Sequence, residues 1–289
     1  MDVRSDGISS TGRRYDRSTT NIGQAASKTV VDGLKRTVRF VISDEDQNWI
    51  RTIYPRLEFR GGQPPRSLVG LLDFNYVPPQ CPSVVTDKGL ETSRIRDSYN
   101  IKVLFDEPRP AYSFLPAVKE LDGRIERSGQ MHGIANPLDM HISQGQVCLC
   151  TPLEESEYLP DGFFLDQYIS ELLVPFLYGQ SFFERHGVWP WETRSHGFLG
   201  ILESYADLTS SNRSVKPFEA RRTLESIVKS ANDDGARRIK KALEADKPLH
   251  GHTLCPCGSG KRFRECHPQA FQGFWQLWQD TRDGERRNG

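Results

Sequence analysis

The segment Tyr99-Asn-Ile-Lys-Val-Leu-Phe105 alternates in polarity, and this period of two predicts a β-strand. Two further strands are predicted before it, at Leu57-Glu-Phe-Arg60 and Leu68-Val-Gly-Leu-Leu-Asp-Phe74, and one after it, at Ala117-Val-Lys-Glu-Leu121. Turns rich in glycine and proline separate the four segments. Closely spaced turns favour sequential antiparallel neighbours, so we expect residues 57–121 to form an antiparallel meander.

Helical patterns flank the predicted meander. Ser43-Asp-Glu-Asp46 is typical of a helix cap, and we expect the helix that follows it to end at Pro55. Its apolar residues at helical spacing are Trp49, Ile50, Ile53 and Tyr54. Further helices are predicted at 164–178 (prolonged by 182–185), 196–208, 217–230 and 234–245, with a loop at 122–140 and a linker at 209–215. Strands followed by helices indicate an α+β fold.

The composition limits the classes of function. A chain of 289 residues is long enough for one large domain or one domain plus a small module. Its 38 basic and 38 acidic residues give zero net charge, which argues against a whole-protein electrostatic grip on nucleic acid. No apolar run approaches the roughly 18 residues of a membrane span, so we expect no membrane association.

Cysteine usage and the N-terminus predict a cytoplasmic protein. Six cysteines spread over the chain do not resemble a disulfide scaffold, so a reducing compartment is expected. Residues 1–28 are polar and have no apolar core of a secretory signal. We expect them to belong to a disordered tail, residues 1–38. Cys81, in a proline-flanked loop, is expected to have no special role.

A metal site is predicted near the C-terminus. The sequence Cys255-Pro-Cys257-Gly-Ser-Gly-Lys-Arg-Phe-Arg-Glu-Cys266-His267 supplies three thiolates and one imidazole, a normal tetrahedral set for Zn²⁺. The Gly-Ser-Gly turn lets the two pairs of ligands converge. The segment resembles the SEC-C motif, a zinc knuckle found in many unrelated proteins. That resemblance implies Zn²⁺ as the cofactor and a portable interaction module.

Residues around the predicted knuckle leave alternatives open. His250 and His252 are expected at the surface, because Cys255, Cys257, Cys266 and His267 already close the site. Four aromatic residues recur at helical spacing after it: Phe271, Phe274, Trp275 and Trp278. They form either a helix face that packs on the knuckle or an exposed aromatic surface for a partner.

A reactive cysteine is predicted in His141-Ile-Ser-Gln-Gly-Gln-Val-Cys148-Leu-Cys150. A cysteine nucleophile needs access, an assisted thiolate and donors for the oxyanion formed in acyl transfer. Gly145 permits a tight turn, and Val147 would anchor a strand that leaves Cys148 on the opposite face. Alternation places Cys150 on the same face as Cys148, so spacing alone does not choose between them.

The order of these elements resembles the ubiquitin-conjugating enzyme fold. In that family a His-Pro-Asn turn precedes a Gly-x-Ile-Cys-Leu segment whose cysteine carries the modifier as a thioester. The resemblance assigns the family histidine to His141 and the acyl-carrying cysteine to Cys148. Ser143 stands where the family has the asparagine that supports the oxyanion, and the turn is shorter.

Residues 39–207 also resemble bacterial members of cyclic-oligonucleotide-based antiphage systems. The similar pieces are Tyr54-Pro-Arg-Leu-Glu-Phe, Tyr99-Asn-Ile-Lys-Val, Pro116-Ala-Val-Lys-Glu, and Trp189-Pro followed by His196-Gly. The resemblance implies a protein partner with a glycine-like C-terminus, a cyclic-oligonucleotide synthase. With no nucleotide-binding glycine loop in the chain, a separate activating enzyme or an activated donor would be needed.

Two histidines and one tryptophan complete the predicted site. His196 is a candidate for setting the thiol pKa or for proton transfer, and Trp189 for a wall of the site. A purely structural role, bonding the turn for His141 and filling the interior for His196, is the alternative.

Three functions are therefore weighed. They are a ubiquitin-conjugating-like transferase acting through Cys148, a non-catalytic scaffold that grips the same partner, and a zinc-knuckle adaptor for protein or nucleic acid. The predicted organisation is a tail (1–38), a conjugating-like domain (39–208), a helical linker region (209–247), and the knuckle with a terminal helix (248–289).

Overall fold

The computed structural model describes residues 29–32, 35–38, 40–79, 89–90, 93–106, 115–210, 234–244 and 248–287. The predictions for the tail at 1–28, for Cys81 and for a helix at 217–230 lie outside these residues. The linker predicted at 209–215 is helical in its first two residues, which end α6 (Phe198–Ser210), and its remainder lies outside the described residues. Within 29–38, where disorder was predicted, β1 (Thr29–Asp32) and β2 (Lys35–Val38) pair antiparallel. Both strands carry β-branched residues, which favour extended structure.

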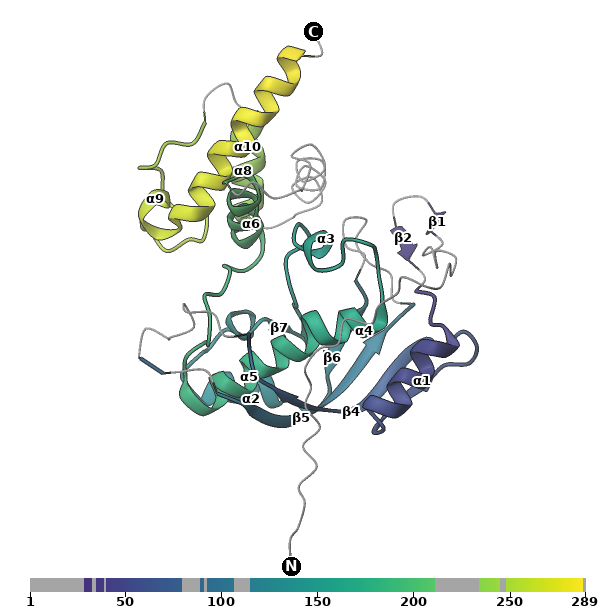
Figure 1. Cartoon of the computed structure of the whole chain (residues 1–289). Coiled ribbons are helices and arrows are strands. Elements are labelled where there is room, and N and C mark those ends of the chain that lie inside the picture. The colour runs from purple at the N-terminus through teal and green to yellow at the C-terminus, as the bar shows by residue number, and fades with distance from the viewer. Residues whose placement is uncertain are drawn as a thin grey trace, which may run out of the picture.

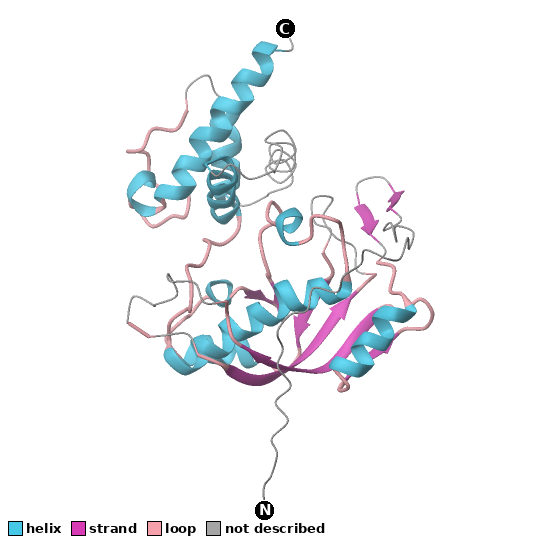
Figure 2. Ribbon diagram, in the orientation of Figure 1, coloured by secondary structure: helices cyan, strands magenta, loops and turns pink. Residues whose placement is uncertain are grey.

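A six-stranded sheet is the main layer of the structure (Figures 1 and 2). Its strands are β3 (Leu57–Arg60), β4 (Ser67–Tyr76), β5 (Ile95–Leu104), β6 (Ala117–Glu120), β7 (Ile142–Ser143) and β8 (Gln146–Val147). The order is β3-β4-β5-β6-β8-β7, and every pair is antiparallel. The predicted meander and the mixed α+β class are confirmed.

The longest pairing lies at the centre of the sheet, where β4 and β5 pair from Ser67↔Leu104 to Tyr76↔Ile95. One long helical stretch crosses this region (Figure 2) and covers its apolar face. It comprises α4 (Leu165–Tyr168), a π-helical turn η2 (Ile169–Leu173) and α5 (Val174–His186). Pro175 has no N–H, and the wider π-turn before it accommodates the missing helical bond.

Helix α1 (Asp44–Ile53) begins and ends where the sequence predicted. The Ser43 hydroxyl accepts a bond from the Asp46 amide, and the Asp46 carboxylate accepts one from the Ser43 amide, so a capping box closes its N-terminus. Ile50 is fully buried, whereas Ile53 is exposed and does not extend the apolar face.

Residues 122–140, predicted as a loop, contain α2 (Arg124–Met131) and the 3-10 helix η1 (Pro137–Met140). The prediction was wrong because α2 has few apolar residues: its buried residues are Ile125, Ser128 and Gly129. Its position is fixed by charge instead. Arg124 bonds the carboxylates of Asp97 on β5 and Glu184 on α5.

A second apolar core lies beside the sheet (Figure 1). It is built from α6 (Phe198–Ser210), α8 (Asp234–Glu244), α9 (Phe263–Cys266) and α10 (Pro268–Arg287). Helices α6 and α10 approach so closely that a Cβ on Gly273 would lie 1.9 Å from the Leu202 carbonyl oxygen. The buried side chains of α6 pack in this core, although the predicted domain ended at 208; the division into domains stays a prediction. No described helix is both long and apolar enough to cross a membrane.

Gly70 lies in β4 opposite Leu57 of β3, at a point where a side chain does not fit. Its φ is +136°, and an added Cβ would lie 2.2 Å from the Arg56 carbonyl oxygen. We expect Gly70→Ala to destabilise the fold by about 3 kcal/mol or more, because strain and a backbone clash add. Gly62→Ala is the control, since Gly62 also has a positive φ but no atom within 4 Å. Urea unfolding followed by tryptophan fluorescence measures both, and equal losses would contradict this account.

Candidate functional site

A tight hairpin carries the predicted cysteine. Ile142 pairs with Val147, and both side chains are buried. Gln144 and Gly145 form the turn with positive φ angles of 51° and 76°, the conformation that favours two-residue hairpins. A bond from the Glu120 amide to the Gly145 carbonyl, 2.8 Å long, ties the turn to β6. The end of β8 is therefore fixed to the edge of the sheet.

Cys148 follows β8 directly, and its amide donates to the His141 carbonyl at 2.8 Å. This bond continues the hairpin ladder by one position, so His141 and Cys148 lie opposite each other. Directly opposed residues have Cβ atoms about 5 Å apart. Ser143 pairs instead with Gln146, nearer the turn. It lies two ladder positions from Cys148, roughly 7 Å along the strand.

The two thiols of the segment have different surroundings. Cys148 is exposed, and its Sγ lies 3.7 Å from the Cys150 carbonyl oxygen. Cys150 is half-buried and packs against the sheet core. Burial, and then the carboxylates of Glu155 and Glu154, raise the pKa of the Cys150 thiol well above its usual value. The strand ends at Val147, so alternation does not continue to Cys150. The structure thus gives the two thiols different surroundings, which the alternation in the sequence did not predict.

The ring of His141 lies in a small aromatic corner. It packs 5.5 Å from the Trp189 ring and 4.6 Å from the His196 ring, measured between centroids. Its backbone is left-handed, with φ 55°, and closes η1 through a bond to the Leu138 carbonyl. Burial, and then the neighbouring charge of His196, lower the pKa of His141 to about 4. The imidazole of His141 is therefore neutral at pH 7.

His196 adds a second imidazole and brings a carboxylate with it. Its Nε2 lies 3.8 Å from Asp139 Oδ1, and 26% of its side chain is exposed, so it does not simply fill the interior. Burial lowers the pKa of His196, and the carboxylates of Asp139 and Glu203 only partly oppose that shift. Asp139 was missed in the sequence because it meets His196 only after folding.

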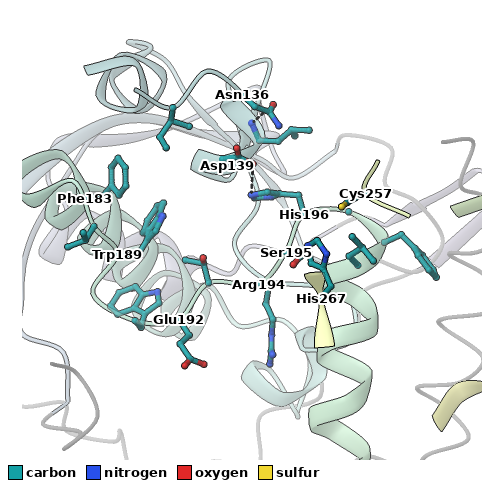
Figure 3. Close-up of a pocket in the computed structure, with 18 of the residues that line it drawn as sticks. Asn136, Asp139, Phe183, Trp189, Glu192, Arg194, Ser195, His196, Cys257 and His267 are labelled. Atoms are coloured by element: carbon teal, nitrogen blue, oxygen red, sulfur yellow. Dashed lines mark hydrogen bonds and ion pairs between the residues drawn. The ribbon is translucent and has the colours of Figure 1, made fainter. Parts of the chain in front are cut away.

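A cleft of about 1260 Å³ opens beside these residues (Figure 3). Asp139, Trp189 and His196 line it from the side of the sheet, and Cys257 and His267 line it from the predicted knuckle. Neither Cys148 nor His141 is among its lining residues. The structure therefore brings the predicted residues together in two adjoining places: the hairpin end, with His141 and Cys148, and the cleft, with His196.

The predicted metal ligands converge. The ligand atoms of Cys255, Cys257, Cys266 and His267 all lie within 4.8 Å of one another. Neighbouring thiolates on a tetrahedral Zn²⁺ are roughly 3.8 Å apart, given Zn–S bonds of about 2.3 Å. The Cys257 and Cys266 sulfurs lie 3.6 Å apart, and the Cys255 sulfur lies 3.1 Å from His267 Nδ1. This donor set fits a zinc site.

Local structure holds the cluster together. The turn from Cys255 to Lys261 contains Gly258 and Gly260, both with positive φ angles. A bond from the Cys255 amide to the Lys261 carbonyl closes this turn. Phe263, between the ligand pairs, is fully buried in the second core. His250 and His252 are exposed as predicted and stack on each other.

The aromatic residues of α10 divide between the two predicted roles. Phe274 is fully buried in the second core, and Phe271 packs against Phe263 of the knuckle at 5.5 Å. Trp275 and Trp278 are only partly buried and contact each other at 5.9 Å. Packing on the knuckle therefore accounts for one part of this face, and the two indoles remain accessible.

Comparison with known proteins agrees with the metal cluster. The SEC-C motif matches residues 253–267, which contain all four ligands. Searches among curated proteins and among solved structures found no match. The motif covers a small part of the chain, so it identifies the knuckle alone.

We expect the purified protein to hold about one equivalent of Zn²⁺, because a closed set of four ligands binds one ion. Cys266→Ser removes a ligand and is expected to lose most of the metal. Cys150→Ser, which changes a thiol far from the cluster in sequence, is the control and should keep it. Elemental analysis after gel filtration measures this. Equal metal contents in the two variants would contradict the assignment.

The depressed pKa of His141 predicts a pH effect on stability. Between pH 6.5 and 4 the unfolded chain binds a proton that the folded site excludes, so stability falls as the pH is lowered through this range. We expect His141 to account for about 2 kcal/mol of that fall. Urea unfolding at pH 7 and pH 4.5 should show a weaker pH dependence in His141→Gln than in the wild type. The exposed His252→Gln is the control, and no difference between the two variants would refute the effect.

Proposed function

We propose that the protein is a ubiquitin-conjugating-like cysteine transferase in which Cys148 accepts the C-terminal acyl group of a partner protein. One observation carries the proposal: of the two thiols in the segment, the exposed one stands at the end of an anchored hairpin, opposite His141. An acyl-accepting thiol needs both access and a fixed direction of attack. Cys148 has the access, and the His141 carbonyl holds its backbone.

The arrangement of elements supports the same proposal. An N-terminal helix is followed by an antiparallel meander, then by the cysteine, then by a helix that crosses the sheet. This is the order for which the sequence resembles the ubiquitin-conjugating fold. Because residues 39–207 resemble antiphage proteins, we propose a cyclic-oligonucleotide synthase as the partner.

The proposed reaction has two steps. The Cys148 thiolate attacks the carbonyl carbon of the partner's activated C-terminus, a C–S bond forms, and the donor's leaving group departs. Activation comes from a separate enzyme that supplies an acyl adenylate or a thioester. A primary amine then attacks, a C–N bond forms, and the C–S bond breaks to restore the thiolate. The amine gives up its proton to a base.

The two histidines would have different parts in this chemistry. With a pKa of about 4, His141 is too weak a base to hold the proton at pH 7, so we assign it to shaping the hairpin end. Burial lowers the pKa of His196 as well, but the carboxylates of Asp139 and Glu203 partly oppose that shift and the ring is partly exposed, so we assign proton uptake to His196. Asp139 would stabilise the imidazolium that forms.

A non-catalytic scaffold is the second candidate, and the cleft favours it. The cleft has aromatic and charged walls and lies between the sheet and the knuckle, as a site that grips a partner chain would. A Zn²⁺ bound by Cys255, Cys257, Cys266 and His267 would hold the knuckle wall in place. In this case Cys148 would be dispensable.

Substitutions at the two thiols decide between these functions. The protein is co-expressed with the genes that flank its own and analysed on denaturing gels. We expect an adduct that thiols cleave in the wild type and in Cys150→Ser, and none in Cys148→Ala. Cys148→Ser should form an oxygen ester that resists thiols, because the serine hydroxyl can accept the same acyl group. A thiol-sensitive adduct in Cys148→Ala would refute the transferase proposal.

A further inference from the structure

The chain leaves the sheet core immediately after the two thiols. Cys150 packs against the first core, whereas Leu153 is 4% exposed and packs in the second core. Between them, the Thr151 hydroxyl lies 2.8 Å from the Ser204 hydroxyl of α6 in a buried contact. A few residues after Cys148, the backbone is thus attached to the body that carries the knuckle.

An arginine strengthens this attachment. Arg194 Nε donates to Glu154 Oε1 at 3.1 Å, and the same guanidinium pairs with Asp207 on α6. Glu154 in turn accepts bonds from the Thr151 amide and hydroxyl, both at 3.0 Å, through its other oxygen. Only 13% of the Glu154 side chain and 31% of the Arg194 side chain are exposed, so salt screens these bonds less than surface pairs.

The network continues to the start of α10, next to a metal ligand. Gln269 Nε2 donates to Asp207 Oδ1 at 2.5 Å. Gln269 lies in the first turn of α10, which begins at Pro268, directly after His267. The amide of His267 donates to the carbonyl of Phe263, the buried residue between the two ligand pairs. The position of Gln269 therefore depends on the fold of the knuckle.

We propose that the metal-loaded knuckle clamps the segment that follows Cys148, and that Arg194 is the positioning residue that transmits this restraint. The path runs from His267 through Gln269 and Asp207 to Arg194, and from there to Glu154 and Thr151. The proposal gives the knuckle a role in ordering the thiol segment. It does not rest on thioester transfer, because its test needs no partner.

The physical reason is that the bound metal cross-links an otherwise small fold. Without it the three thiols and the imidazole have no common partner, and α9 and the first turn of α10 lose their restraint. Asp207 then loses a bond, and Arg194 holds Glu154 less firmly. Residues 151–155 open more often, and Cys150 becomes accessible each time they do.

Cys150 is therefore the reporter. In a Cys148→Ser background, the tryptic peptide of residues 128–185 contains Cys150 as its only cysteine. Its iodoacetamide alkylation rate is measured by mass spectrometry for the full chain, with and without zinc. We expect Arg194→Ala and zinc removal each to raise the rate roughly tenfold. The rate follows the population of the open state, and a modest drop in the free energy of local opening raises that population by this factor. Arg194→Lys should lie in between.

Two further measurements distinguish the clamp from general loosening. Arg56→Ala, which breaks an exposed ion pair with Asp73 on the sheet, is the matched control and should leave the Cys150 rate unchanged. In the Arg194→Ala variant, zinc removal should add less than about twofold, because both changes act on the same path. If zinc removal raises the Cys150 rate as much in Arg194→Ala as in the protein with Arg194, the two changes act independently, and the role of Arg194 is refuted. An unchanged rate on zinc removal from a protein that stays folded by circular dichroism would refute the clamp.

Discussion

The hydrogen bond from the Cys148 amide to the His141 carbonyl, 2.8 Å long, is the contact on which the rest of the site depends. It is the last bond of a hairpin whose register is set by the buried pair Ile142 and Val147. Beyond it the strand ends, and the two cysteines turn to different surroundings. A slip of the register by one residue would turn a buried side chain of this pair toward solvent, so the pair keeps the register fixed.

The second constraint is that the chain passes between two apolar cores close to this hairpin. Residues 187–197 lead from the sheet core to the second core, whereas residues 151–155 form a loop that leaves the sheet core, packs Leu153 in the second core and returns. Arg194 of the connection holds Glu154 of this loop. The cleft lies beside the connection and shares walls with the knuckle (Figure 3). The predicted zinc site is thus linked to the segment that follows the thiols through Gln269, Asp207, Arg194 and Glu154, although none of its four ligands lies in that segment.

Local features were predictable from the sequence. The cap at Ser43, the alternating strand at Tyr99 and the ligand spacing from Cys255 to His267 each depend on residues close together in the chain. Helix α2 was missed because Arg124 secures it through charges on β5 and α5, which no apolar period reveals.

The site depends on contacts that the sequence does not display. Cys148 and Cys150 differ only because β8 ends at Val147, and the end of a strand depends on its partner strand. Asp139 meets His196, and Arg194 meets Glu154, only when distant segments are brought together. The fold class was therefore within reach of the sequence, and the electrostatic surroundings of the thiols were not.

The transferase proposal requires that Cys148 carry an acyl group in the cell. The most direct measurement is to isolate the protein from its native cells under acidic, denaturing conditions and map peptide 128–185 by mass spectrometry before and after neutral hydroxylamine. We expect a peptide-derived mass on Cys148 that hydroxylamine removes and whose fragments identify the partner's C-terminus. A Cys148 that is unmodified while the protein is active in its cell would contradict it.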